Sequence, residues 1–138
     1  MNAVIGQEAP NLEVADWLQG KPTNIDRERG RVVIVEVFQV NCPGCFLYGI
    51  PEMINIHHKY NNEGVRVLGV ATAFEDFDKN TPDNLARLIR TGEVIGDTLK
   101  TLSQHGQLNG NMLRYGIPFP LGTDKLIEIK AIPTRKPS

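Results

Sequence analysis

Residues 31–51 read RVVIVEVFQVNCPGCFLYGIP, and this stretch decides the fold because an almost continuous apolar run leads into two closely spaced cysteines. The run is rich in β-branched and aromatic residues, which is typical of a strand buried on both faces of a mostly parallel sheet. Such a strand delivers the residues after it to the carboxyl edge of the sheet, where chemistry gathers in open α/β folds. The stretch therefore predicts an α/β domain with reactive groups at that edge.

The two cysteines, Cys42 and Cys45, are separated by Pro43 and Gly44. Proline suits the first position of a helix, because it lacks the N–H group that would be unpaired there and its φ angle is already set. Cys42 is thus expected at a helix N-terminus, where unpaired N–H groups and the helix dipole favour a thiolate. Cys45 is one turn further on, which is close enough to form a disulfide.

A Cys-x-x-Cys pair at a helix start after a buried strand is the thioredoxin-like redox arrangement. Further segments occur in an order that resembles the thioredoxin-like superfamily, most closely its TlpA-like and alkyl-hydroperoxide-reductase-like branch: GQEAPNLEVADWLQGK, RGRVVIVEVFQVNCPGC, GIPEM, GVRVLGVATAFED and IPFPLGTDK. The resemblance covers roughly residues 6–125. It implies a three-layer α/β fold with a central, mostly parallel sheet. It also implies a thiol-disulfide oxidoreductase in which Cys42 attacks and Cys45 resolves.

Length and composition fit one domain that spans residues 1–138. With 41% hydrophobic and 22% charged residues, the chain can bury a core without disulfide or metal staples. Fifteen basic residues against sixteen acidic ones predict that neither nucleic acid nor a membrane surface is a partner. No stretch approaches the roughly 20 apolar residues of a transmembrane helix, and the N-terminus lacks the features of a secretory signal. A cytoplasmic location is the default, or an extracytoplasmic one such as the periplasm if a leader was removed.

The partners that the resemblance implies are protein or small-molecule disulfides and thiols, together with a second redox protein as electron donor or acceptor. No cofactor is expected beyond the Cys42–Cys45 dithiol itself. His57 and His58 invite a metal interpretation, but helix geometry puts His57 about 18 Å along the helix from Cys45. No metal site is therefore expected there.

Glu36 interrupts the apolar strand, and a buried unpaired carboxylate is rare because its ionised form loses hydration. It stands six residues before Cys42, where thioredoxins place a buried acid, and this resembles a proton relay to the resolving Cys45. Two structural interpretations compete with the relay. Glu36 either pairs with a cation such as Lys59 or points to solvent at a sheet edge.

Two other functions remain open. Peroxiredoxins carry Pro-x-x-x-Thr/Ser-x-x-Cys at their peroxidatic cysteine, and this chain has Val35 in place of the proline and Gln39 in place of the Thr or Ser. A peroxiredoxin-like peroxide reductase is therefore the second enzymatic hypothesis.

Asn41 also replaces the tryptophan that thioredoxins usually carry before the first cysteine. A non-enzymatic redox-sensing or binding module is the third hypothesis.

Several local features complete the expected fold. Pro51 predicts a kink near Gly49 in the helix that follows the cysteines. Residues 76–115 are expected to be a helical insertion, with a helix that starts at Thr81. The prolines in residues 117–122 demote that stretch to an edge or irregular strand, and the charged run 26–30 is expected to be a solvated turn.

The end of the chain departs most from the family pattern. Residues 132–134 spell Ile-Pro-Thr, the tripeptide that contains a cis-proline opposite the redox motif in thioredoxins. Either Pro133 is that cis-proline, or the chain stops before this loop and the fold lacks its C-terminal strands and helix. In the second case the sheet keeps an unpaired edge, which predicts a homodimer that pairs strands across it.

Overall fold

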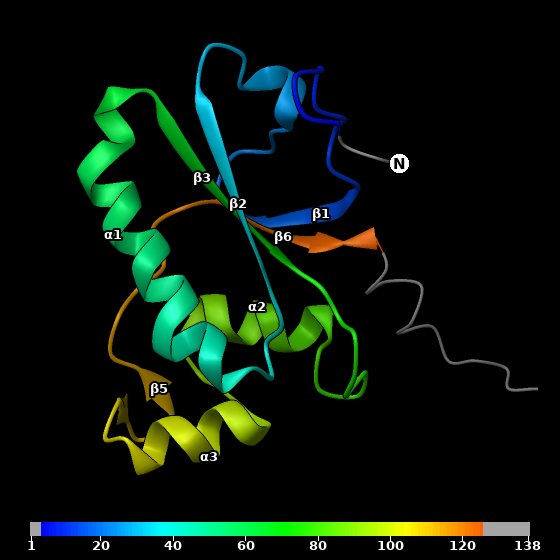
Figure 1. Cartoon of the computed structure of the whole chain (residues 1–138). Coiled ribbons are helices and arrows are strands. Elements are labelled where there is room, and N and C mark those ends of the chain that lie inside the picture. The colour runs from blue at the N-terminus through cyan, green and yellow to red at the C-terminus, as the bar shows by residue number, and fades with distance from the viewer. Residues whose placement is uncertain (1–3, 126–138) are drawn as a thin grey trace, which may run out of the picture.

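The computed structural model describes residues 4–125, which form a four-stranded sheet with helices packed against it (Figure 1). Its strands lie in the order β1-β6-β3-β2. Strands β2, β3 and β6 run parallel, and β1 is antiparallel to β6. Their bounds are β1 (Val14–Gln19), β2 (Val32–Phe38), β3 (Val65–Ala71) and β6 (Leu121–Asp124). The expected α/β class with a mostly parallel sheet is confirmed.

The helices are α1 (Ile50–Tyr60), α2 (Pro82–Thr91) and α3 (Gly96–Gln104), with shorter helical segments η1 (Ile25–Arg27), η2 (Cys45–Gly49) and η3 (Asn61–Glu63). A small hairpin of β4 (Leu108–Asn109) and β5 (Met112–Leu113) follows α3. In Figure 1, α1 runs alongside β2 and β3, and α3 lies near the end of β2 that leads to the cysteines. No helix in residues 4–125 is long and apolar enough to cross a membrane.

One apolar cluster joins the sheet to all three helices. Ile34 pairs with Val67, and Phe38 pairs with Ala71, so these side chains lie on the same face of the sheet. The helices add buried apolar residues to this face, among them Ile50 from α1, Leu85 from α2 and Leu102 from α3. The cluster packs α1 and α3 against the end of β2. It therefore holds the loop from β2 to α1, which carries the cysteines.

The expectation that β2 is buried on both faces is wrong. β2 is an edge strand of the described sheet, and Val32 and Val37 are 63% and 53% exposed. β3 is an inner strand instead, and its last five residues are buried. A continuous β-branched run favours a strand but carries no information about which strands lie beside it, and this is why the prediction failed.

Of the two expectations for residues 117–122, the edge strand is wrong, whereas residues 117–120 are irregular as the other expectation has it. β6 begins at Leu121, after both prolines of this stretch, and lies between β1 and β3. Pro120 takes part only through its carbonyl, which accepts a hydrogen bond from the N–H of Gly69 at 2.9 Å. Because no proline lies inside the strand, no donor is lost from the ladder.

The charged run 26–30 is not wholly solvated. Glu28 is 6% exposed and forms an ion pair with Arg66 at 3.1 Å, so part of this run is a buried polar contact. The predicted start of α2 is confirmed, because the Thr81 side chain accepts the N–H of Asn84 at 3.1 Å. The helix ends at Gly92, whose φ of 82° suits a left-handed cap.

Candidate redox site

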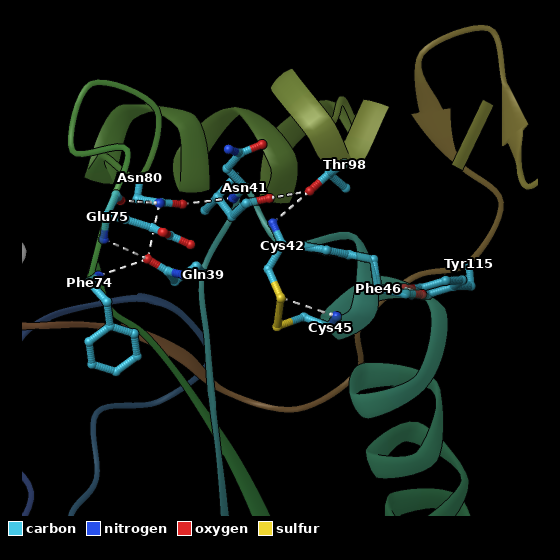
Figure 2. Close-up of a disulfide and its surroundings, with 11 residues drawn as sticks. Gln39, Asn41, Cys42, Cys45, Phe46, Phe74, Glu75, Asn80, Thr98 and Tyr115 are labelled. Atoms are coloured by element: carbon cyan, nitrogen blue, oxygen red, sulfur yellow. Dashed lines mark hydrogen bonds between the residues drawn. A yellow bond between two sulfur atoms is a disulfide. The ribbon is translucent and has the colours of Figure 1, made fainter. Parts of the chain in front are cut away.

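Cys42 and Cys45 form a disulfide in the loop that follows β2, with their Cα atoms 5.4 Å apart (Figure 2). Helical backbone begins at Pro43, so Cys42 directly precedes a helix as predicted. The N–H of Cys45 lies 3.3 Å from the sulfur of Cys42 and also donates to the carbonyl of Cys42. A backbone donor therefore points at the first sulfur of the pair.

The kink expected near Gly49 takes the form of a π-helix, η2, between the cysteines and α1. The N–H of Ile50 bonds to the carbonyl of Cys45, five residues back, and not to that of Phe46. Pro51 has no N–H, so it cannot donate to Phe46 in the π-helical pattern either. The carbonyl of Phe46 is therefore left without a helical donor.

Tyr115 supplies the missing donor. Its hydroxyl donates to the carbonyl of Phe46 at 2.8 Å, across 69 residues of sequence (Figure 2). Burial raises the pKa of Tyr115 well above its ordinary value, so the hydroxyl keeps the proton that this bond needs. The segment after β5 thereby fastens the first turn of the redox helix.

Glu36 lies on the helix-bearing face of the sheet, opposite Gly69 in the neighbouring strand. A Cβ at Gly49 would lie 2.7 Å from the Oε2 atom of Glu36, so the absence of a side chain at Gly49 makes room for the carboxylate. Burial raises the pKa of Glu36. Within residues 4–125 Glu36 forms no ion pair, so the expected alternative of pairing with Lys59 is wrong.

The redox loop is held from outside by polar side chains that we call the loop clamp: Gln39, Asn41, Asn80 and Thr98. The backbone N–H of Asn41 donates to the Asn80 side chain at 2.7 Å. Gln39 accepts from Asn80 and from the N–H of Phe74 at 2.7 Å (Figure 2). These bonds tie the loop after β2 to the loop after β3.

Within the loop clamp, Thr98 is the residue that bonds to Cys42 itself. Its side chain is 0% exposed, its hydroxyl accepts the N–H of Cys42 at 2.8 Å, and it donates to the carbonyl of Val40 at 2.8 Å. Asn41 binds the start of α3 as well, because its Oδ1 accepts the N–H of Asp97 at 2.7 Å. Helix α3 is thus bonded to the residues on both sides of Asn41.

Sequence reasoning identified some of these residues and missed others. It singled out Gln39 and Asn41 only as departures from family motifs, whereas the structure shows that both hold the loop. It did not identify Asn80, Thr98 or Tyr115, because their partners lie between 39 and 69 residues away. The proposed cis-proline, Pro133, lies outside the described residues.

Together the fold and the site define a class: a thioredoxin-like α/β domain with a Cys-Pro-Gly-Cys disulfide at a helix start. Two solved structures are similar to this chain, each with 28% sequence identity and a TM-score of 0.57. One is a thioredoxin-like superfamily protein, which covers 85% of this chain. The other is a thiol-disulfide isomerase from Corynebacterium glutamicum, which covers 91%. They confirm the resemblance to the thioredoxin-like superfamily.

Similar proteins also occur among longer chains. DipZ of Mycobacterium bovis is 31% identical over 83 residues, which is 57% of this chain and 12% of DipZ. FixW of Rhizobium leguminosarum is 28% identical over 71 residues, which is 51% of this chain and 31% of FixW. This chain matches 62% of the length of each of the two solved structures. No family model matches the sequence.

Proposed function

We propose that this protein is a thiol-disulfide oxidoreductase that exchanges electrons with substrate disulfides through Cys42 and Cys45. The observation that carries the proposal is the N–H of Cys45, which lies 3.3 Å from the Cys42 sulfur at the start of a helix. A donor in this position stabilises a thiolate, which is the attacking form of cysteine. The likeness to a solved thiol-disulfide isomerase supports the same function.

In the proposed reaction, the Cys42 thiolate attacks one sulfur of a substrate disulfide, and the other substrate sulfur leaves as a thiolate that takes up a proton. Cys45 then loses its proton and attacks the Cys42 sulfur of the mixed disulfide. The second substrate thiolate leaves, and the Cys42–Cys45 disulfide forms. Two electrons have moved from the protein to the substrate, and a redox partner or a dithiol returns them.

We further propose that Glu36 accepts the proton of Cys45. The carboxylate lies against Gly49, which is four residues after Cys45 in the same helical segment. In this proposal a water molecule carries the proton from the thiol to the carboxylate. The raised pKa of Glu36 makes its carboxylate a stronger base than an exposed one, which suits the task.

Reduction of insulin disulfides with dithiothreitol as the electron source tests the proposal. Wild-type protein should accelerate the reaction, Cys42→Ser should abolish the acceleration, and Cys45→Ser should accumulate a mixed disulfide with the substrate. Equal rates for wild type and Cys42→Ser would remove the enzyme hypothesis and leave a binding or sensing module. Hydrogen peroxide consumption much faster than insulin reduction would instead favour the peroxide reductase.

A further inference from the structure

A second polar feature lies at the opposite end of the sheet from the cysteines. It is a surface pocket of about 340 Å³ lined by Lys21, Pro22, Thr23, Arg27, Glu28, Arg31, Arg66 and Pro120. Arg31 directly precedes β2, whereas the cysteines follow the end of that strand. Seven residues of strand therefore separate the pocket from the redox loop, a distance of about 20 Å. We call this feature the basic pocket.

The carboxylate of Glu28 contacts several side chains that line the basic pocket. It is 6% exposed, its Oε2 atom accepts the hydroxyl of Thr23 at 2.5 Å, and its Oε1 atom lies 3.1 Å from the Nε of Arg66 and 3.8 Å from that of Arg31. Burial alone would raise the pKa of Glu28, but the bonds from Thr23 and Arg66 and the arginine charges outweigh it and lower the pKa. Glu28 is therefore ionised and holds two guanidinium groups beside one oxygen atom.

The pocket keeps more positive charge than Glu28 can compensate. Both arginines contact Glu28 through Nε, and no hydrogen bond from their terminal Nη groups is found among residues 4–125. Lys21 and Arg27 form no ion pair within the same residues. Four cations face one carboxylate, so the lining carries a net charge of about +3.

We propose that the basic pocket binds a phosphate group, with the Nη atoms of Arg31 and Arg66 as donors and Lys21 and Arg27 as further counter-charges. Guanidinium forks match phosphate oxygens in pairs, and a small site with several converging cations suits an anion of more than one charge better than a carboxylate. Because Glu28 already holds Arg66 by a hydrogen bond and attracts Arg31, less side-chain freedom is lost on binding. The site is separate from the cysteines, so the proposal does not depend on the redox function.

Isothermal titration calorimetry on the whole oxidised chain in chloride buffer tests this proposal, with inorganic phosphate and glycerol 3-phosphate as probes. Wild type should bind saturably with one site, and added salt should weaken the binding. Lys21→Met and Arg27→Met should each weaken it about three- to tenfold, because each removes one nearby charge in a solvated site. Neither residue has an ion-pair partner among residues 4–125, so both variants should stay folded.

Matched controls use exposed cations on helices away from the pocket, Lys100→Met and Arg87→Met. Both should bind phosphate as wild type does. Tighter binding of glycerol 3-phosphate would identify a phosphorylated metabolite as the ligand, and tighter binding of inorganic phosphate would identify the free ion. The proposal is overturned by no saturable binding of either probe up to about 10 mM, by acetate binding as tightly as phosphate, or by equal weakening in the control variants.

Discussion

Replacing Thr98 with valine tests how far α3 controls the redox loop. Valine keeps the shape of threonine but removes the hydroxyl, so the N–H of Cys42 loses its acceptor and the carbonyl of Val40 loses its donor. Thr98 is 0% exposed, so water cannot easily replace either bond. A buried backbone group left without a partner costs about 1–3 kcal/mol, so Thr98→Val should lower the free energy of unfolding by roughly 2–4 kcal/mol.

Two further variants separate the hydroxyl from general packing. Thr98→Ser keeps both hydrogen bonds and loses one methyl group, which should cost only about 1 kcal/mol. Thr101→Val makes the same chemical change on α3 at a partly exposed position, and it should change stability by less than about 0.5 kcal/mol. Urea unfolding of the oxidised proteins, followed by circular dichroism, measures all three values.

The same variants test whether Thr98 acts as a positioning residue for Cys42. If the hydroxyl fixes the backbone at Cys42, Thr98→Val should slow insulin reduction at temperatures where the variant is fully folded, and Thr98→Ser should restore most of the rate. The pH dependence of Cys42 alkylation should shift in the valine variant and not in the serine variant. Unchanged stability and unchanged alkylation in Thr98→Val would refute the assignment.

Three other features give predictions. Tyr115→Phe leaves the carbonyl of Phe46 unpaired and should lower the free energy of unfolding by about 1–2 kcal/mol, whereas Tyr48→Phe, at a side chain that is 71% exposed, should have no measurable effect in the same urea titration. Burial raises the pKa of Glu36 above its ordinary value of 4.5, so the folded state holds this proton more tightly than the unfolded state does. Stability should therefore fall as pH rises from about 4.5 through the raised pKa of the folded state. Glu36→Gln should remove this pH dependence and slow mixed-disulfide resolution at least about tenfold, and an unchanged resolution rate would leave Glu36 structural. Within residues 4–125 β2 is an edge strand, which predicts a homodimer by light scattering that Val37→Lys dissociates, and a monodisperse wild-type monomer would contradict this.

The sequence predicts well those features that depend on neighbouring residues. The β-branched run before Cys42 is a strand, Pro43 opens a helix, and Thr81 caps another, because propensity and capping act over a few positions. The distortion caused by Pro51 was also predictable, since a proline inside a helix removes a hydrogen bond to the preceding turn. Its form as a π-helix was not, because the group that pairs with the freed Phe46 carbonyl, the hydroxyl of Tyr115, is distant in sequence.

Lateral strand order and the loop clamp could not be predicted in the same way. The pattern predicts a buried β2 and an edge position for β6, whereas β2 is the edge strand of the described sheet and β6 lies inside it. A hydrophobic pattern reports the burial of a segment and not which strands lie beside it. Thr98 looks like an ordinary polar residue in a helix, and its role appears only when α3 folds back across 56 residues onto Cys42. The chemistry-bearing cysteines were evident from spacing, whereas the groups that position them were evident only from the fold.

Asn41 shows why a departure from a family motif can be a structural requirement. The side chain is 5% exposed, and its Oδ1 must accept the N–H of Asp97 to hold the start of α3. A tryptophan there has an indole N–H that donates but cannot accept, so it would leave the Asp97 N–H unpaired. The absence of a side chain at Gly96 leaves room for this contact, because a Cβ there would lie 2.5 Å from the Oδ1 of Asn41. The φ of 57° at this position also favours glycine. Asn41 therefore serves the docking of α3, which brings residues of the 76–115 segment into contact with the loop that carries the cysteines.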